Sequence, residues 1–341
     1  MKRNEILYYF GYYAKLFTDT FVFQKVNVNE YPLSISVEAS SACNLSCEYC
    51  YQKDWEKQIK REKGSLSLKL FKELLEYLSK LPKKIDINFD MGGEPFLNPN
   101  IIDMINCVPS YRGNISITTN GALMSKELID LILNSRLYKI NFSIDVINGI
   151  NIRHGFDMEN VIYFIETIIR ERKKLKKCRP IVAVRSVGWD GVSKAYVRKL
   201  FKEKPDSIFL SPPTNWAGLI KKPELRNGHH ICLFPWVQMA MLYTGEFVVC
   251  CNDPRGEYIV GKFPEDSIEK IWTGNKLYEI RRIIINKNQK FLNGQYCGCC
   301  SVLRNGIPLK YYINLMFDKL NNIKTVNNRR LKSITLEEKY K

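Results

Sequence analysis

The strongest constraint on the fold is an alternation of short apolar runs with longer amphipathic stretches between residues 33 and 210. The runs that have the length of buried strands are 33–39, 85–90, 114–118, 139–144, 181–186 and 207–210. The intervening stretches with helical periodicity are 67–81, 100–107, 125–134, 158–176 and 192–203. Strands that alternate with helices form parallel βαβ units with right-handed crossovers. The sequence therefore predicts an α/β fold with a wound or barrel-like sheet.

The alternation of strands and helices ends near residue 212, and we expect the chain to have four parts. Residues 213–305 are loop-rich and hold six of the 11 cysteines, which predicts a separate cysteine-rich module. Residues 29–212 form the expected barrel, and residues 1–28 carry an amphipathic helix over 5–22. Residues 306–341 are expected to form a helix over 308–320 followed by a disordered basic tail.

The chain is strongly basic, with 52 Lys and Arg against 35 Asp and Glu, a formal charge of +17. The densest basic run, 170–179, is not interleaved with aromatic residues, and no nucleic-acid module is recognisable. The charge therefore favours an anionic small substrate over nucleic acid. The sequence has no signal-peptide cleavage site and no uncharged run that could span a bilayer. Clustered cysteines in such a chain indicate reduced thiols, and we expect a cytoplasmic protein.

Three cysteines directly after the first expected strand carry the most chemical information. Cys43, Cys47 and Cys50 follow a C-x3-C-x2-C spacing within one loop. Three thiolates from one loop can hold three irons of a [4Fe–4S] cluster, which leaves the fourth iron open, as in catalytic metal sites. The alternative is structural zinc with a distant fourth ligand, although zinc sites usually pair C-x2-C units, which this loop lacks.

This triplet, with aromatic Tyr49 before its last cysteine, resembles the radical S-adenosylmethionine (radical SAM) superfamily. The resemblance implies that S-adenosylmethionine (SAM) chelates the open iron. It also implies that reduction of the cluster cleaves SAM to a 5′-deoxyadenosyl radical, which abstracts a substrate hydrogen atom. The implied fold is a partial (β/α)6, TIM-like barrel, and the implied partner is an electron donor of the flavodoxin or ferredoxin type.

A glycine-rich segment follows the second expected strand. Gly92 and Gly93 let the backbone approach a ligand closely, and Glu94 offers a carboxylate to an ammonium group. With Pro95 they match the Gly-Gly-Glu-Pro segment of the superfamily, which binds the amino group of SAM.

Further polar residues lie at the carboxyl ends of later strands, where parallel barrels build their sites. By resemblance, Ser143 and Asp145 contact the ribose of SAM, Arg185 binds its methionine carboxylate, and Asn120 lies nearby. Tyr49, in the cysteine loop, completes the expected SAM-binding residues. Taken singly, a Thr-Asn-Gly turn at residues 119–121 or an ion-paired Arg185 is also a common structural feature.

The cysteines of residues 213–305 resemble the SPASM/twitch auxiliary-cluster region found in radical SAM proteins. The opening C-x12-G-x4-C of Cys232, Gly245 and Cys250 fits that signature, but no cysteine follows Cys300, so we expect one auxiliary [4Fe–4S] cluster. Its expected ligands are Cys232, Cys250, Cys297 and Cys300. Cys251 and Cys299 are neighbours that could replace Cys250 or Cys297, and zinc remains an alternative metal for four thiolates.

Together these features predict a radical SAM oxidoreductase, although they name no catalytic residue. We expect net oxidation of a small polar substrate such as a sugar derivative, with the auxiliary cluster taking up the electron. Too few residues precede the barrel for a peptide-binding domain, which favours the small molecule. The alternatives are a peptide or protein side-chain maturase and an epimerase that uses a spare thiol. A non-catalytic iron–sulfur or zinc scaffold would leave the Gly-Gly-Glu-Pro segment unexplained.

Overall fold

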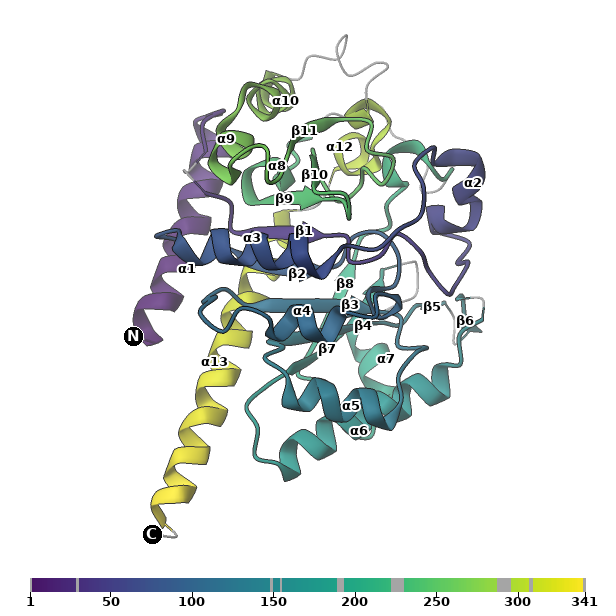
Figure 1. The fold of residues 1–341 in the computed structure, drawn as a ribbon, viewed down its shortest axis with the longest axis vertical. Coiled ribbons are helices and arrows are strands. Elements are labelled where there is room, and N and C mark those ends of the chain that lie inside the picture. Colours follow the sequence, from purple (N-terminus) through teal and green to yellow (C-terminus); the bar gives the residue numbers. More distant parts are fainter. Residues whose placement is uncertain are drawn as a thin grey trace.

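The computed structural model describes residues 2–28, 31–147, 150–153, 155–188, 193–221, 230–286, 296–306 and 309–339. Its centre is a nine-stranded sheet in the order β11-β10-β9-β1-β2-β3-β4-β7-β8 (Figure 1). The parallel strands are β1 (Ser34–Val37), β2 (Asp86–Phe89), β3 (Ile115–Thr119), β4 (Lys139–Ser143), β7 (Ile181–Val187) and β8 (Ser207–Ser211). They match the six predicted strands within two residues at each end. The sheet does not close, which confirms the partial barrel.

The parallel strands place apolar side chains on one face and polar side chains on the other, because successive residues of a strand point to opposite faces. In β2, Ile87 and Phe89 are fully buried in the main hydrophobic core, whereas Asp86 and Asn88 line an internal cavity. In β4, Phe142 is buried and Asn141 lines the same cavity. Barrels of this kind usually fill their interior with branched apolar side chains. This barrel has a polar interior, which we call the lumen.

The helices that flank the strands lie close to their predicted positions: α3 (Leu68–Lys80), α4 (Ile101–Asn106), α5 (Lys126–Asn134), α6 (Met158–Lys174) and α7 (Lys194–Lys199). Helix α3 begins where the Ser67 hydroxyl accepts a hydrogen bond from the Leu70 backbone N–H at 3.2 Å, a standard N-cap. Its apolar stripe, which includes Phe71, Leu74 and Leu78, is buried against the sheet. Burial of this stripe provides most of the helix's stability.

The cysteine-rich module continues the barrel sheet. It comprises α8 (Phe234–Val237), β9 (Gln238–Met241), β10 (Glu246–Val248), β11 (Ile259–Lys262), α9 (Ile268–Thr273), α10 (Asn275–Asn286) and α12 (Ser301–Asn305). Strand β9 pairs in parallel with β1, and β10 and β11 add antiparallel strands beyond it. The module therefore lies beside the first barrel strand, above it in the view of Figure 1.

The two terminal helices are α1 (Lys2–Phe17), which runs into a π-helical turn (Thr18–Val22), and α13 (Leu309–Lys339); they contact each other. The predicted end of the last helix at Leu320 and the predicted disordered tail are wrong, because the helix continues to Lys339. Its polar composition hides tertiary partners: Ile323 and Val326 are buried, and Asp318 pairs with Lys139 at the first position of β4. Residue 308, where this helix was expected to begin, lies outside the described residues.

Short elements complete the fold. They are α2 (Trp55–Gln58), the hairpin of β5 (Val146–Ile147) and β6 (Ile150–Asn151), and the 3-10 turns Tyr51–Asp54, Pro95–Leu97, Trp216–Gly218 and Tyr296–Cys299. Within the part of the chain that the structure describes, no helix combines the length and the apolar character needed to cross a membrane.

Candidate active site

One cavity of about 500 Å³ brings together most of the residues that the sequence singled out. Its lining includes Cys43, Tyr49, Cys50, Gly92, Gly93, Glu94, Asn120, Ser143, Asp145, Arg185 and Cys251. Cys47 is buried beside it, with its Sγ atom 3.9 Å from Nη1 of Arg153, which does line the cavity. The predicted clustering of strand-end residues around the cysteine loop is therefore present in the fold.

The Gly-Gly-Glu-Pro segment lies directly against the start of the cysteine loop. The Gly93 N–H donates to the Ser40 carbonyl at 2.7 Å, and the Glu94 N–H donates to the Ala42 carbonyl at 2.8 Å. A Cβ atom at position 93 would lie 1.7 Å from the Ala42 carbonyl oxygen, so only glycine fits there. Gly92 has a φ of +85°, a conformation that favours glycine. These glycines bring the backbone of the segment onto the loop that carries the cysteines.

The Glu94 carboxylate lies at the junction of the second and third strand ends and is only 2% exposed. Its Oε1 accepts from the Thr119 hydroxyl at 2.7 Å, and its Oε2 accepts from the Asn120 N–H at 2.8 Å. Burial raises the pKa of this carboxyl group, and the hydrogen bonds from Asn120 and Thr119 act against that shift. Because each carboxylate oxygen has two lone pairs, Glu94 keeps acceptor capacity toward the cavity.

Asp145 connects the fourth strand end to the cysteine loop. Its Oδ2 accepts from the Tyr49 hydroxyl at 2.7 Å and from Arg153 Nε at 2.9 Å, and its Oδ1 accepts from the Val187 N–H at 2.6 Å. The carboxylate of Asp145 is almost fully buried. It therefore fixes the orientation of Tyr49 and Arg153 beside the cysteines.

Two arginines lie at different places in the cavity. Arg153, which our sequence reasoning missed, interacts electrostatically with Cys43, Cys47 and Glu94. Arg185, which it singled out, acts instead on Asp90 and on Asp318. The assignment of Arg185 to the SAM carboxylate stays a prediction, and Arg153 is the guanidinium nearer the three cysteines. No sequence signal marks Arg153, because it follows the short β5–β6 hairpin rather than a barrel strand.

The alternation within the strands is the signal that would have revealed the other missed lining residues. Strands β1 to β4 carry polar residues at every second position, and those of β2 to β4 form much of the lumen, together with Asp90 just after β2: Asp86, Asn88, Asp90, Ser116, Thr118, Lys139 and Asn141. A half-buried strand with an apolar core face usually turns its polar face to solvent. Here the polar face turns to a ligand-sized interior.

The three loop cysteines provide a donor set that fits an iron–sulfur cluster. Cys43 and Cys50 line the cavity, and the Asn120 amide nitrogen lies 3.9 Å from Cys43 Sγ. Burial raises the pKa of the Cys50 thiol to about 12 and also raises those of Cys43 and Cys47. Thiolate ligands therefore need positive charge beside them, which iron supplies when it binds.

Five of the six cysteines of the module lie in the interior, and Cys251 acts electrostatically on both Cys232 and Cys250. Cys232 and Cys250 act electrostatically on each other and on Cys297 and Cys300, and burial raises the pKa of all four thiols. Cys250 and Cys300 belong to a second hydrophobic core, against which Cys232 and Cys297 pack. Across the described ranges, no three His, Cys, Asp or Glu side chains converge as tightly as a single metal ion requires.

The remaining two thiols face in different directions. Cys299 is exposed, whereas Cys251 lines the cavity, where the Gln238 amide nitrogen lies 3.6 Å from its Sγ. Asn215 holds the loop that carries the last three cysteines: its side-chain amide donates to the Cys299 carbonyl at 2.8 Å and accepts from the Ser301 N–H at 2.9 Å.

Comparison with family models identifies both parts of the chain. Residues 37–203 match the model of the radical SAM superfamily, and residues 232–301 match the SPASM model, an iron–sulfur cluster-binding domain. The chain belongs to the radical SAM superfamily. Its SPASM domain follows the radical SAM domain, as the sequence predicted, and the metal group of that domain is iron–sulfur rather than zinc.

Several curated relatives of this radical SAM protein are enzymes or cofactor-modifying proteins. A tungsten-containing aldehyde ferredoxin oxidoreductase cofactor-modifying protein of Pyrococcus furiosus is 28% identical over 78% of this chain and 86% of its own length. An S-adenosyl-L-methionine-dependent 2-deoxy-scyllo-inosamine dehydrogenase of Niallia circulans is 22% identical over 73% of this chain and 86% of its own length.

Solved structures share the radical SAM fold. BtrN in complex with AdoMet and 2-DOIA aligns with a TM-score of 0.55 at 20% identity, over 79% of this chain and 92% of BtrN. Streptococcus suis SuiB bound to the precursor peptide SuiA aligns with a TM-score of 0.61 at 15% identity, over 88% of this chain and 76% of SuiB. At these identities the likeness concerns the fold.

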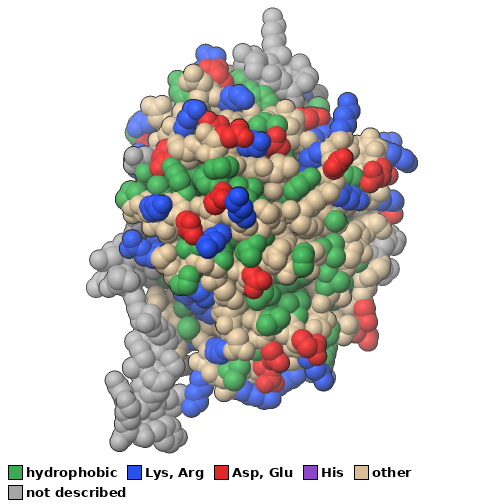
Figure 2. All heavy atoms as spheres, in the orientation of Figure 1, with side chains coloured by type: hydrophobic (Ala, Val, Ile, Leu, Met, Phe, Trp, Pro, Cys, Tyr) green, Lys and Arg blue, Asp and Glu red, His purple; other side chains and the backbone are tan. Residues whose placement is uncertain are grey.

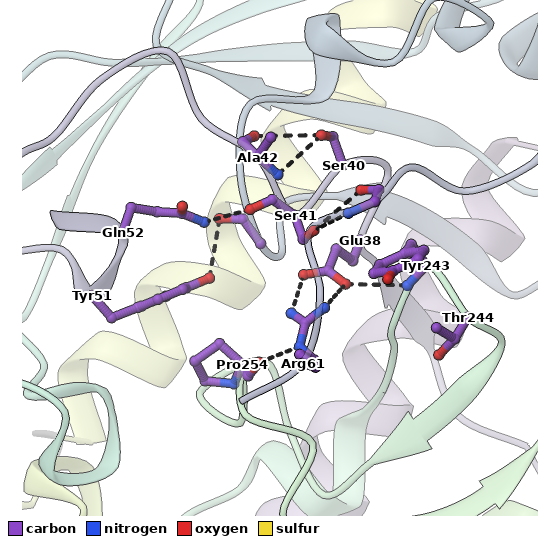
Figure 3. A network of polar contacts seen from close by, with 12 residues as sticks. Glu38, Ser40, Ser41, Ala42, Tyr51, Gln52, Arg61, Tyr243, Thr244 and Pro254 are labelled. Carbon is purple, nitrogen blue, oxygen red and sulfur yellow. Dashed lines mark hydrogen bonds and ion pairs between the residues drawn. The ribbon is translucent and has the colours of Figure 1, made fainter. Parts of the chain in front are cut away.

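A buried ion pair joins the cysteine loop of the radical SAM domain to the SPASM domain (Figure 3). Glu38, directly after β1, binds the Arg61 guanidinium through both carboxylate oxygens and accepts from the Tyr243 N–H at 3.2 Å. Arg61 Nε also donates to the Pro254 carbonyl at 2.5 Å, and its guanidinium lies 4.9 Å from the centre of the Trp55 ring. The loop that holds Cys43, Cys47 and Cys50 is thereby fixed to both domains.

Proposed function

We propose that this radical SAM enzyme is a dehydrogenase that oxidises an alcohol group of a small polar substrate, such as a sugar derivative. The observation that carries the proposal is the polar lumen, which lies between the cysteine loop and the SPASM domain. Its volume of about 500 Å³ falls within the range of small-molecule sites.

The lining of the lumen suits a substrate with several hydroxyl groups. Asn88, Asn141, Thr118, Ser211 and Thr214 present amide and hydroxyl groups, which can both donate and accept hydrogen bonds. The buried Oδ1 atom of Asn141 has no hydrogen-bond partner within the described residues. An apolar substrate would leave it unsatisfied, at a cost of about 1–3 kcal/mol.

The relatives support the same reaction class. The Niallia circulans protein is named as a SAM-dependent dehydrogenase of 2-deoxy-scyllo-inosamine, and it aligns with most of this chain. BtrN, whose structure holds AdoMet and 2-DOIA, shares the fold. Peptide modification is the alternative, because SuiB, which shares the fold, was solved bound to a precursor peptide.

The residues of the carboxyl end would hold the two cofactors. Cys43, Cys47 and Cys50 would hold the catalytic [4Fe–4S] cluster. SAM would be bound by Tyr49, Gly92, Gly93, Glu94, Asn120, Ser143, Asp145 and Arg185. When bound, these groups supply the radical chemistry that removes a hydrogen atom from carbon. The chain orients the substrate and keeps water from the reacting atoms.

The distribution of surface charge bears on whether the protein binds nucleic acid or a small anionic partner. On the face seen in Figure 2, Lys and Arg side chains are scattered among acidic and apolar ones and do not form one basic patch. A nucleic-acid-binding surface usually gathers its basic residues on one face. The formal charge of +17 fits the attraction of an anionic small molecule or of an acidic electron donor of the flavodoxin or ferredoxin type.

The test is anaerobic reconstitution with iron and sulfide, followed by incubation with SAM, a strong reductant and 2-deoxy-scyllo-inosamine. We expect 5′-deoxyadenosine and a ketone product that has lost two hydrogen atoms. The Cys43→Ala variant, treated in the same way, is the negative control for SAM cleavage. Cleavage of SAM without any oxidised product from this compound or from a panel of sugars would contradict the dehydrogenase proposal.

One observation favours a second candidate, an epimerase. Cys251 lines the cavity beside Asp90, so its thiol is placed where a hydrogen atom could be returned to a substrate radical. The same reaction run in deuterated water separates the two candidates. An epimerase gives a product of unchanged oxidation state that carries solvent deuterium on carbon, and the Cys251→Ala variant loses that label.

A further inference from the structure

A carboxylate without an assigned role faces the lumen between the two iron–sulfur regions. Asp90 follows the last residue of β2, and its side chain is exposed within the cavity. Among the described residues it takes part in no ion pair. The groups that face it come from four other elements: the Ser36 hydroxyl of β1, the Arg185 guanidinium of β7, the Cys251 thiol of the SPASM domain and the Tyr311 hydroxyl of α13.

The other carboxylate of the same strand shows what a structural role in this lumen looks like. Asp86, four residues earlier, pairs with Lys319 of α13 at 2.7 Å and accepts from the Asn114 N–H at 2.9 Å. Asp90 lies on the same face of the strand, because residues of even spacing point the same way. Its carboxylate has cavity in front of it where Asp86 has a lysine.

Oxidation of a secondary alcohol to a ketone removes one hydrogen atom from carbon, one electron, and one proton from oxygen. The SAM-derived radical would take the hydrogen atom, and the iron–sulfur group that Cys232, Cys250, Cys297 and Cys300 would hold could take the electron. The proton needs an acceptor within hydrogen-bond reach of the substrate oxygen. We propose that Asp90 binds the reacting hydroxyl group of the substrate and accepts its proton as the C=O bond forms.

The groups around Asp90 complement this change in the substrate. A hydroxyl group can donate to the Asp90 carboxylate and accept from Tyr311 or Arg185, and the product carbonyl keeps only the second kind of bond. The surrounding protein keeps the Asp90 carboxyl group away from bulk water and so raises its pKa, although the charge of Arg185 acts against that shift. A raised pKa makes the carboxylate a stronger base near neutral pH.

This inference rests on the proposed dehydrogenase function, so its experiment keeps the two separate. The reconstituted wild type, Asp90→Asn and Asp206→Asn are given SAM, reductant and myo-inositol that carries deuterium on its ring carbons. For Asp90→Asn we expect deuterium still to enter 5′-deoxyadenosine, while ketone formation falls about 100-fold or more, as for loss of a general base. Asp206→Asn, which changes a carboxylate paired with Arg172 and Arg329 outside the cavity, should form ketone at a rate close to the wild type.

A second readout does not depend on turnover. Binding of myo-inositol to the cluster-loaded, unreduced proteins is followed by saturation-transfer nuclear magnetic resonance, and we expect roughly tenfold weaker binding for Asp90→Asn only. Ketone formation and binding by Asp90→Asn at wild-type levels would overturn the role of Asp90 while leaving the dehydrogenase proposal intact. A wild type that neither binds nor oxidises myo-inositol, 2-deoxy-scyllo-inosamine or any sugar of the panel would overturn both.

Discussion

The two ends of the lumen differ in how their charged side chains are paired. At the amino end of the strands, helix α13 forms ion pairs with the barrel: Lys319 with Asp86, Asp318 with Lys139, and Arg329 with Asp206. At the carboxyl end, Glu94 and Asp90 form no ion pair within the described ranges, although Arg153 acts electrostatically on Glu94 and Arg185 on Asp90. An ion pair there, between Arg153 and Asp145, also binds the cysteine loop through Tyr49 and Cys47.

The difference indicates that charges at the amino end hold the structure together, whereas charges at the carboxyl end are available to a ligand. Paired charges at the amino end satisfy one another and hold α13 across the barrel. Within the described residues, Glu94 and Asp90 are in no ion pair, so they keep acceptor capacity for a ligand, at a cost in desolvation that the rest of the fold must offset. The following predictions test whether the two ends can be altered independently.

Loss of a loop cysteine should have the largest effect. Cys43→Ala removes a ligand for the catalytic cluster, so we expect no 5′-deoxyadenosine above background after reconstitution. The matched control is Cys107→Ala, a half-buried thiol at the end of α4 that the cavity does not include. Full SAM cleavage by Cys43→Ala, measured by liquid chromatography, would remove this loop from the catalytic site.

Weakening the ion pair at the carboxyl end should have a smaller effect on catalysis. Asp145→Asn keeps the shape of the side chain but removes the charge that orients Arg153 and Tyr49. We expect SAM cleavage to slow about 10–100-fold, as for other residues that orient cluster or metal ligands. Asp318→Asn at the opposite end should stay close to the wild-type rate, and an equal loss in both variants would erase the distinction.

Breaking an ion pair at the amino end should instead cost stability. Asp318→Asn leaves the buried Lys139 ammonium without its carboxylate, which we expect to lower the free energy of unfolding by about 1–3 kcal/mol. Urea denaturation measures this change. Lys270→Ala, which removes an exposed pair with Asp266, should change stability by less than about 1 kcal/mol.

The smallest expected effect is a dependence on acid. Burial alone would raise the pKa of Asp206, but Arg172 and Arg329 hold it below the ordinary value of 3.8. A carboxyl group with a lowered folded-state pKa stabilises the fold above its unfolded pKa and loses that contribution as the pH falls through the folded value. As the pH is lowered below about 4, the urea concentration at half-unfolding should therefore fall more steeply for the wild type than for Asp206→Asn.

The barrel and its cysteine loop could be predicted from the sequence because both depend on local patterns. The strands are short apolar runs bounded by polar residues, and Cys43, Cys47 and Cys50 lie within eight residues of one another. The placement of Glu94 and Asn120 followed from their position at strand ends, since parallel strands end at one edge of the sheet.

The contributions of Arg153, Tyr311 and Arg61 could not be predicted, because each depends on a tertiary contact. Arg153 reaches the site from a hairpin, and Tyr311 reaches it from a helix that neither family model covers. The length of α13 was missed for the same reason. Its charged residues resemble an exposed tail until their partners in the lumen are known.

Helix α13 is synthesised after every strand of the sheet. While the chain is still on the ribosome, Lys139 and Asp86 therefore lack their partners, and the lumen is open at its amino end. All the cysteines expected to bind clusters precede this helix, so both metal centres can be loaded into an open barrel. A cluster loaded at that stage would already be in place when α13 packs across the amino end of the barrel.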